Sequence, residues 1–132
     1  MKQRIFIAFR VPEKIRLELI RIQNELKEKN KKAHVTWSKS HGFHITVQFI
    51  GEIEEHKVEQ IKKALLDIAN SHHGFNYWLD HLDGFPNPAH TKIITMRCEE
   101  EKRAGYAINE DFVHKLKDLE LIHDDKPWKP HI

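Results

Sequence analysis

A histidine and a threonine lie two residues apart in the segment FHITVQFI, residues 43–50, whose β-branched and aromatic residues predict a β-strand. Side chains alternate along a strand, so His44 and Thr46 share one face, about 6–7 Å apart. An imidazole that titrates near neutral pH beside a hydroxyl donor suits binding and proton transfer at a phosphate group. The spacing therefore indicates phosphate chemistry on a strand face that turns to solvent or to a cleft.

The opposite face of this strand is apolar. Phe43, Val47 and Phe49 fall on it, and we expect them to pack in the core against helices. By the same alternation, Gln48 and Ile50 fall on the face of His44.

A second His-Ile pair, His131 and Ile132, closes the chain in PWKPHI, and no threonine follows it. We expect His131 to begin a second copy of the His-x-Thr motif that is interrupted. The two halves of the chain would then be a diverged duplication of strand, helix and His-bearing strand, although they share little sequence apart from the histidines.

Three helices and five strands are predicted around these motifs. Pro12 suits the first turn of a helix that ends in the charged run 27–32 and whose apolar stripe comprises Ile15, Leu19, Ile22 and Leu26. Two more helices are predicted at 55–70 and 109–119, the last one capped by Asn109. The predicted strands are 3–9, 34–37, 43–50, 75–82 and 91–97, with a loop at 83–88 that contains one glycine and two prolines.

The composition is that of one ordinary globular domain. Of the 132 residues, 39% are hydrophobic and 32% are charged, and the net charge of +2 permits an anionic partner without arguing for one. No apolar run approaches the ~18 residues of a membrane span, and the N-terminus predicts a strand rather than a signal peptide. The single cysteine, Cys98, excludes an internal disulfide and suits a reducing cytoplasm.

Taken in order, the motifs resemble the two-histidine (2H) phosphoesterase superfamily and, within it, the RNA 2',3'-cyclic phosphodiesterases, also called the 2'-5' RNA ligase family. The resemblance covers the whole chain and rests on RIFIAFRVPEKIR, HVTWSKSHGFHITVQFIGEI, GFPNPAHTKIITM and KPWKPHI. It implies an α+β fold of two lobes, each an antiparallel sheet with helices packed on its outer face. Family members continue after the second histidine through a threonine, an arginine and further strands. We therefore expect residues 1–132 to form a single domain that lacks the last strands of its second lobe, as a fragment or a truncated or frameshifted product.

The resemblance also implies a mechanism that needs no metal and no cofactor. His44 would protonate the 3' oxygen of a 2',3'-cyclic phosphate at an RNA end or on a nucleotide, and His131 would deprotonate the attacking water. Thr46 would bind a non-bridging oxygen of the phosphate. The product would be a 2'-phosphomonoester, and the reverse reaction would join RNA ends through a 2'-5' linkage. Which histidine is the acid follows from the family alone.

Several other residues are weaker candidates for RNA binding. Phe85, in the predicted loop, and Trp37 could stack on a nucleobase, although packing is the simpler role for Trp37. Four cations could hold RNA phosphates, although a solvated charge is the commoner role for any one of them: Lys92, Arg97, Lys126 and Lys129. The remaining histidines show no metal-ligand spacing, and Cys98 has no evident activating base.

Two alternatives stay open. A chain of this fold without the second threonine could bind RNA or nucleotides without turnover, or it could be a weakly active or inactive remnant. A sheet without its last strands exposes unpaired backbone edges, so we also expect self-association through those edges.

Overall fold

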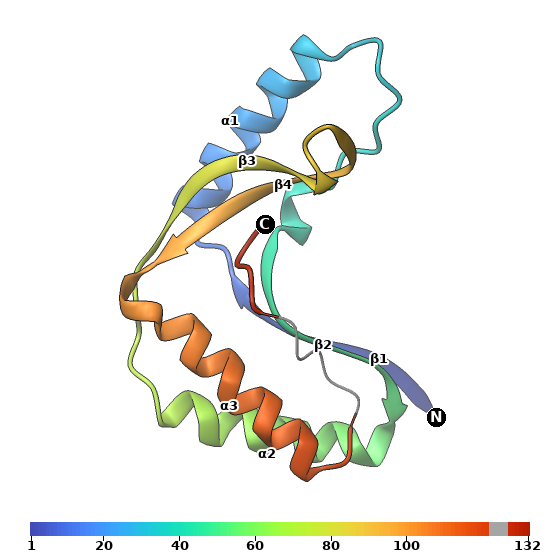
Figure 1. Ribbon diagram of the computed structural model, residues 1–132. Helices are drawn as coiled ribbons and strands as arrows, with labels where there is room; N and C mark the ends of the chain where they lie inside the picture. The colour runs from blue at the N-terminus through green and yellow to red at the C-terminus, as the bar shows by residue number, and fades with distance from the viewer. Residues whose placement is uncertain (122–126) are drawn as a thin grey trace.

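The computed structural model describes residues 1–121 and 127–132, which form two antiparallel two-stranded sheets and three helices (Figure 1). The first sheet pairs β1 (Lys2–Arg10) with β2 (His44–Glu54), and the second pairs β3 (Tyr77–Asn87) with β4 (His90–Glu100). The helices are α1 (Glu13–Lys29), α2 (Glu55–Asn70) and α3 (Ala104–Asp118), with short 3-10 turns at Ser40–Gly42 and Glu101–Arg103. The α+β class and the antiparallel sheets expected from the sequence are confirmed.

The main core lies between the first sheet and the layer formed by α2 and α3. β2 contributes Val47, Ile50 and Ile53, and the two helices contribute Val58, Ile61, Ile68, Ile108, Phe112 and Leu116. Burial of each such side chain contributes roughly 1.5–3 kcal/mol. This packing fixes β2, the strand that begins at His44. In Figure 1, α1 lies away from this layer and behind the second sheet.

Two irregularities in the β1–β2 register change which residues of β2 face the core. Val47 and Ile50 have no partner on β1, because the register skips one residue at each position. An extra residue turns the side chains that follow it to the other face. Phe49 is therefore 46% exposed, and its expected place in the core is wrong, whereas Val47 is buried as expected. Gln48 and Ile50, expected on the polar face, are 2% and 3% exposed.

Two predicted segments differ from the structure in type. Residues 34–37 form no strand, since β propensity decides little where no neighbouring strand offers pairing. The expected loop at 83–88 is largely strand, because β3 continues to Asn87. Pro86 is tolerated there because β3 is an edge strand and its register with β4 shifts between Phe85 and Pro86.

The third helix begins five residues before the predicted cap. The Glu100 carboxylate accepts hydrogen bonds from the backbone N–H groups of Gly105 (2.7 Å) and Tyr106 (3.1 Å) and so satisfies the first turn of α3. Asn109, the predicted cap, is buried inside the helix instead. Its Nδ2 donates to the carbonyl oxygen of Val47, one of the residues that the β1–β2 register skips.

The C-terminal tail pairs with β4, which confirms the predicted start of a strand at the end of the chain. Met96 and Ile132 exchange two backbone hydrogen bonds of 2.9 Å, and the Cys98 N–H donates to Pro130 at the same distance. Trp128 Nε1 donates to the Thr46 carbonyl oxygen at 2.9 Å. The tail therefore touches both sheets, and it ends between them (Figure 1).

Candidate active site

The His44 imidazole is fixed at the start of β2 by two hydrogen bonds. Its Nδ1 lies 2.7 Å from the carbonyl oxygen of Gly42. A carbonyl can only accept, so Nδ1 carries the hydrogen and Nε2 is the nitrogen free for chemistry. Nε2 lies 3.1 Å from Thr46 Oγ1, which can donate to a neutral imidazole or accept from a protonated one. The pair predicted from the sequence is thus in direct contact.

His131 has the same local arrangement in the other half of the chain. Its Nδ1 lies 2.7 Å from the carbonyl oxygen of Lys129, again two residues earlier. The same reasoning leaves its Nε2 free. The imidazole is exposed, and it is held through the pairing of the tail with β4 rather than within a long strand. The two imidazoles are therefore held by the same kind of hydrogen bond, from Nδ1 to a backbone carbonyl oxygen.

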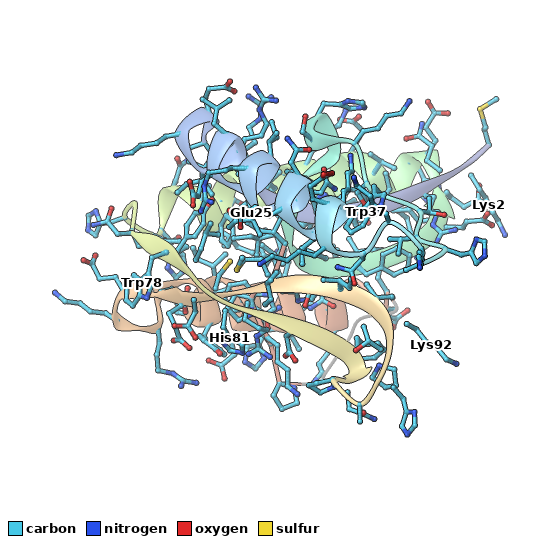
Figure 2. The ribbon with its side chains drawn as sticks, turned by 90° about the horizontal axis from the view of Figure 1, so that it is seen from above. Lys2, Glu25, Trp37, Trp78, His81 and Lys92 are labelled. Carbon is cyan, nitrogen blue, oxygen red and sulfur yellow. The ribbon has the colours of Figure 1, made fainter. Side chains whose placement is uncertain are left out.

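Both histidines and Thr46 line one cleft of about 800 Å³. Its walls come from α1, from residues 33–38 and from β4 together with the tail. Figure 2 places Trp37 near the end of α1 and Lys92 on the β3–β4 hairpin, and both residues line this cleft. The volume falls in the range of about 300–1,000 Å³ that is usual for small-ligand sites. A nucleotide-sized anion therefore has room beside both imidazoles.

The weaker candidates are distributed unevenly. Phe85 lies on β3, is 64% exposed and is not among the residues that line the cleft. Trp37 is half-buried and has the Lys27 ammonium 5.9 Å from its ring centroid. Arg97 is not among the lining residues either, but it lies directly opposite His131, which is one of them, across the β4–tail bridge. Lys126 lies outside the residues that the structure describes.

Sequence reasoning missed several groups around the imidazoles. Gly42 and Lys129 act through their backbone carbonyls, so their side-chain types carry no signal. The Phe6 ring lies 4.9 Å from the His44 ring, at an interplanar angle of 33°. The alternation of β1 identifies the face of Phe6, but only the strand pairing shows that this face is also that of His44.

Cys98 takes no part in this chemistry. Burial raises the pKa of its thiol to about 11, so the group stays protonated at neutral pH. Within residues 1–121 and 127–132, no group of three or more His, Cys, Asp or Glu side chains could hold a metal ion. In the same part of the chain, no helix combines the length and the apolarity that crossing a membrane requires.

The cleft lies between two antiparallel sheets and is lined by one histidine from each half of the chain. Residues 9–95 match the model of the LigT-like phosphoesterase family, and the chain belongs to this family. A curated relative, the RNA 2',3'-cyclic phosphodiesterase of Methanothermobacter thermautotrophicus, is 28% identical over 99 residues. The match covers 75% of this chain and 53% of the relative, so the chain spans about half the length of that protein.

Solved structures show the same fold. A Thermus thermophilus protein, TT0787, superposes with a TM-score of 0.78 at 21% identity, covering 98% of this chain and 71% of its own. Escherichia coli LigT in complex with 3'-AMP superposes with a TM-score of 0.72 at 18% identity, covering all of this chain and 71% of its own. At these identities the likeness concerns the fold alone.

Proposed function

We propose that this chain hydrolyses 2',3'-cyclic phosphates at RNA ends or on nucleotides, using His44 and His131 as its proton carriers. The observation that carries the proposal is the pair of imidazoles on one cleft, each with Nδ1 bonded to a backbone carbonyl, which leaves Nε2 as the nitrogen for proton transfer. Two imidazoles on one phosphate can divide acid and base work between them. The name of the curated relative supports the same reaction class.

The mechanism moves two protons, one from the attacking water to a histidine and one from the other histidine to the leaving oxygen. A water oxygen forms a bond to phosphorus while the bond from phosphorus to the 3' oxygen breaks. His131 Nε2 takes a proton from the water, and the proton on His44 Nε2 goes to the leaving 3' oxygen, so that a 2'-phosphomonoester remains. The assignment of acid and base follows the family resemblance. Thr46 Oγ1, 3.1 Å from His44 Nε2, would donate to a non-bridging oxygen of the same phosphate.

The test is turnover of 2',3'-cyclic AMP by the chain, with the product identified as 2'-AMP or 3'-AMP by chromatography. We expect 2'-AMP, and we expect His44→Ala to reduce turnover by about 10²–10⁴-fold, the usual contribution of a positioned acid or base. Unchanged turnover in His44→Ala would refute the assignment. Tight binding of 2'-AMP without any turnover would favour the alternative of a non-catalytic nucleotide-binding module.

Finer parts of the proposal need separate tests. Reverse 2'-5' ligation would appear as joining of RNA ends that carry a 2',3'-cyclic phosphate and a 5'-hydroxyl. Stacking of a nucleobase on exposed Phe85 would make Phe85→Ala bind dinucleotides more weakly than wild type does. Self-association through sheet edges would appear in sedimentation velocity as a species larger than 15.7 kDa, whereas a strictly monomeric profile would count against it.

A further inference from the structure

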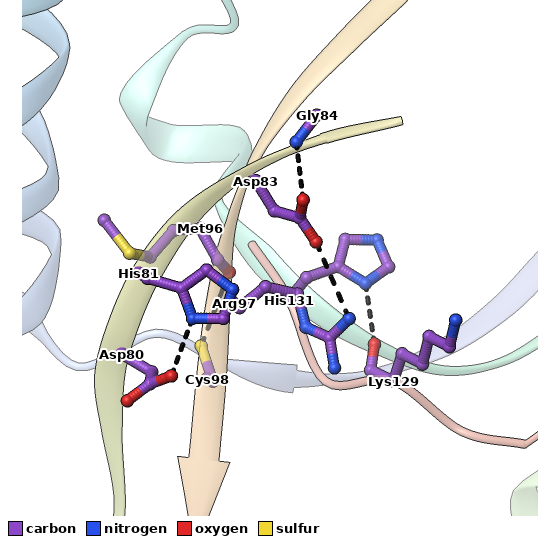
Figure 3. A network of polar contacts seen from close by, with 9 residues as sticks. All are labelled: Asp80, His81, Asp83, Gly84, Met96, Arg97, Cys98, Lys129 and His131. Carbon is purple, nitrogen blue, oxygen red and sulfur yellow. Dashed lines mark hydrogen bonds and ion pairs between the residues drawn. The ribbon is translucent and has the colours of Figure 1, made fainter. Parts of the chain in front are cut away.

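Arg97 lies beside His131 on the same face of the second sheet. The hydrogen bonds of Met96 with Ile132 and of Cys98 with Pro130 flank this position on β4 and the tail. Arg97 and His131 therefore form a pair without backbone hydrogen bonds between them, the kind of antiparallel pair whose side chains lie closest, with Cα atoms about 4.5 Å apart. Figure 3 shows the guanidinium next to the imidazole.

The Arg97 guanidinium has few hydrogen-bond or ion-pair partners among the residues that the structure describes. The ion pair that the structure describes for it joins Arg97 Nη1 to Asp83 Oδ2 at 3.8 Å, near the outer limit of such contacts. Arg97 Nε is buried and has no hydrogen-bond partner among residues 1–121 and 127–132. A guanidinium has five N–H donors, and a buried donor normally has a partner. The side chain is still 26% exposed, so an incoming ligand can reach part of it.

The Asp83 carboxylate makes a second contact besides this ion pair. Its Oδ1 accepts a hydrogen bond from the backbone N–H of Gly84 at 2.8 Å, while Oδ2 is the oxygen nearer to Arg97 (Figure 3). The carboxylate thus contacts the guanidinium through one long ion pair only. Within residues 1–121 and 127–132, Arg97 is thus a cation whose buried Nε–H has no partner, directly across from a proposed proton carrier.

We propose that Arg97 binds a non-bridging oxygen of the substrate phosphate beside His131, as Thr46 does beside His44. The inference rests on the proposed function, because it takes the phosphate to lie between the two histidines. Arginine suits the task because its planar fork donates to phosphate oxygens in a fixed geometry and keeps its charge at every working pH. The second half of the site thus takes its anion-binding group from β4 rather than from the strand of its histidine.

The experiment compares binding of 2'-AMP by wild type, Arg97→Gln, Arg97→Lys and Asp83→Asn, measured by calorimetry, with adenosine as the ligand that lacks phosphate. We expect Arg97→Gln to weaken 2'-AMP binding by about 10–100-fold, the range for a lost charge-assisted hydrogen bond. Arg97→Lys should keep part of the affinity, and adenosine binding should be equal in all four proteins.

Asp83→Asn separates ligand binding from a structural role of the ion pair. Asparagine keeps an oxygen for the Gly84 N–H but releases the guanidinium, so 2'-AMP should bind as tightly as to wild type or more tightly. If Asp83→Asn weakened binding as much as Arg97→Gln does, the ion pair would be structural and the inference would be wrong.

One measurement needs no variant that could fail to fold. In wild-type protein, the Arg97 Nε–H resonance should shift on titration with inorganic phosphate, and a resonance that stays in place would contradict the inference. Wild type that binds 2'-AMP and hydrolyses the cyclic nucleotide, beside an Arg97→Gln variant that does both equally well, would overturn only the role of Arg97. Wild type that does neither would overturn the proposed function and this inference together.

Discussion

The two histidines are presented alike but supported differently. Each imidazole donates a hydrogen bond from Nδ1 to the carbonyl oxygen of the residue two positions earlier, with an N···O distance of 2.7 Å. His44 begins an 11-residue strand whose next residue, Ile45, is 2% exposed, and it has a hydroxyl two residues along the same strand. His131 stands on a short tail held by three backbone hydrogen bonds, and its polar neighbour, Arg97, comes from another strand.

This difference shows that one imidazole geometry can be reached in two ways. In the first half, a buried strand and its sequence spacing set the site. In the second half, backbone pairing with β4 sets the position of His131, so the proposed chemistry depends on whether the tail stays paired with β4. Stability is rarely uniform across a fold, and segments with few buried contacts open most readily. We therefore expect the His131 half to be the more easily disturbed of the two.

The largest expected effect comes from removing either histidine. His131→Gln and His44→Gln should each lower turnover of 2',3'-cyclic AMP by about 10²–10⁴-fold. The double variant should be little worse than either single one, because residues that act as a unit are not additive. His56→Gln is the matched control, since His56 is exposed on α2 and does not line the cleft. Full additivity of the two losses would indicate independent roles and break the comparison.

Thr46 should give the next largest effect. Thr46→Val keeps the β-branched shape of the strand residue and removes only the hydroxyl 3.1 Å from His44 Nε2. We expect a loss of about 10²–10³-fold in kcat, as for other donors to a developing anion. Thr46→Ser should retain most of the activity. Equal losses in the serine and valine variants would mean that packing, not the hydroxyl, is what matters at this position.

Asn109 tests the support of the His44 half. Its buried amide donates to the carbonyl of Val47, a residue that the β1–β2 register skips. Asn109→Leu leaves that carbonyl without this donor, and we expect the free energy of unfolding in urea to fall by about 1–3 kcal/mol. The control is His114→Leu on the exposed side of the same helix, which should change stability little.

Trp128 tests the support of the His131 half. Trp128→Phe removes the indole N–H that donates to the Thr46 carbonyl and keeps an aromatic ring against Phe9 and Tyr106. We expect a cost of about 0.5–1.5 kcal/mol, the smallest of the series, together with faster hydrogen exchange at the Met96 and Ile132 amides. If exchange increased instead across β2, the tail would be supporting the first half rather than only the second.

Much of the fold follows from local sequence. The apolar periodicity of α1 and α2 and the β-branched run of β2 decide those elements almost alone, and His44 and Thr46 follow from alternation within three residues of the strand start. Phe49 and Gln48 could not be placed this way, because the two register irregularities depend on how β1 pairs. The start of α3 could not be placed either, since its cap is the carboxylate of Glu100 rather than a residue type that favours caps.

The second half of the site could be identified only from the three-dimensional structure. PHI at the end of the chain indicated His131, but its neighbours come from pairing with β4, which no spacing reveals. Arg97 stands 34 positions before His131 in the sequence and was only one of four cations named from composition. Tertiary pairing, not propensity, brought the two side chains to one face.

The most direct test is an NMR titration of the two imidazoles with 2'-AMP. If His44 and His131 act on one phosphate, their ring resonances should shift together, with the same dissociation constant and a stoichiometry of one ligand per chain. A shift confined to one histidine, or two shifts with clearly different dissociation constants, would contradict the shared site.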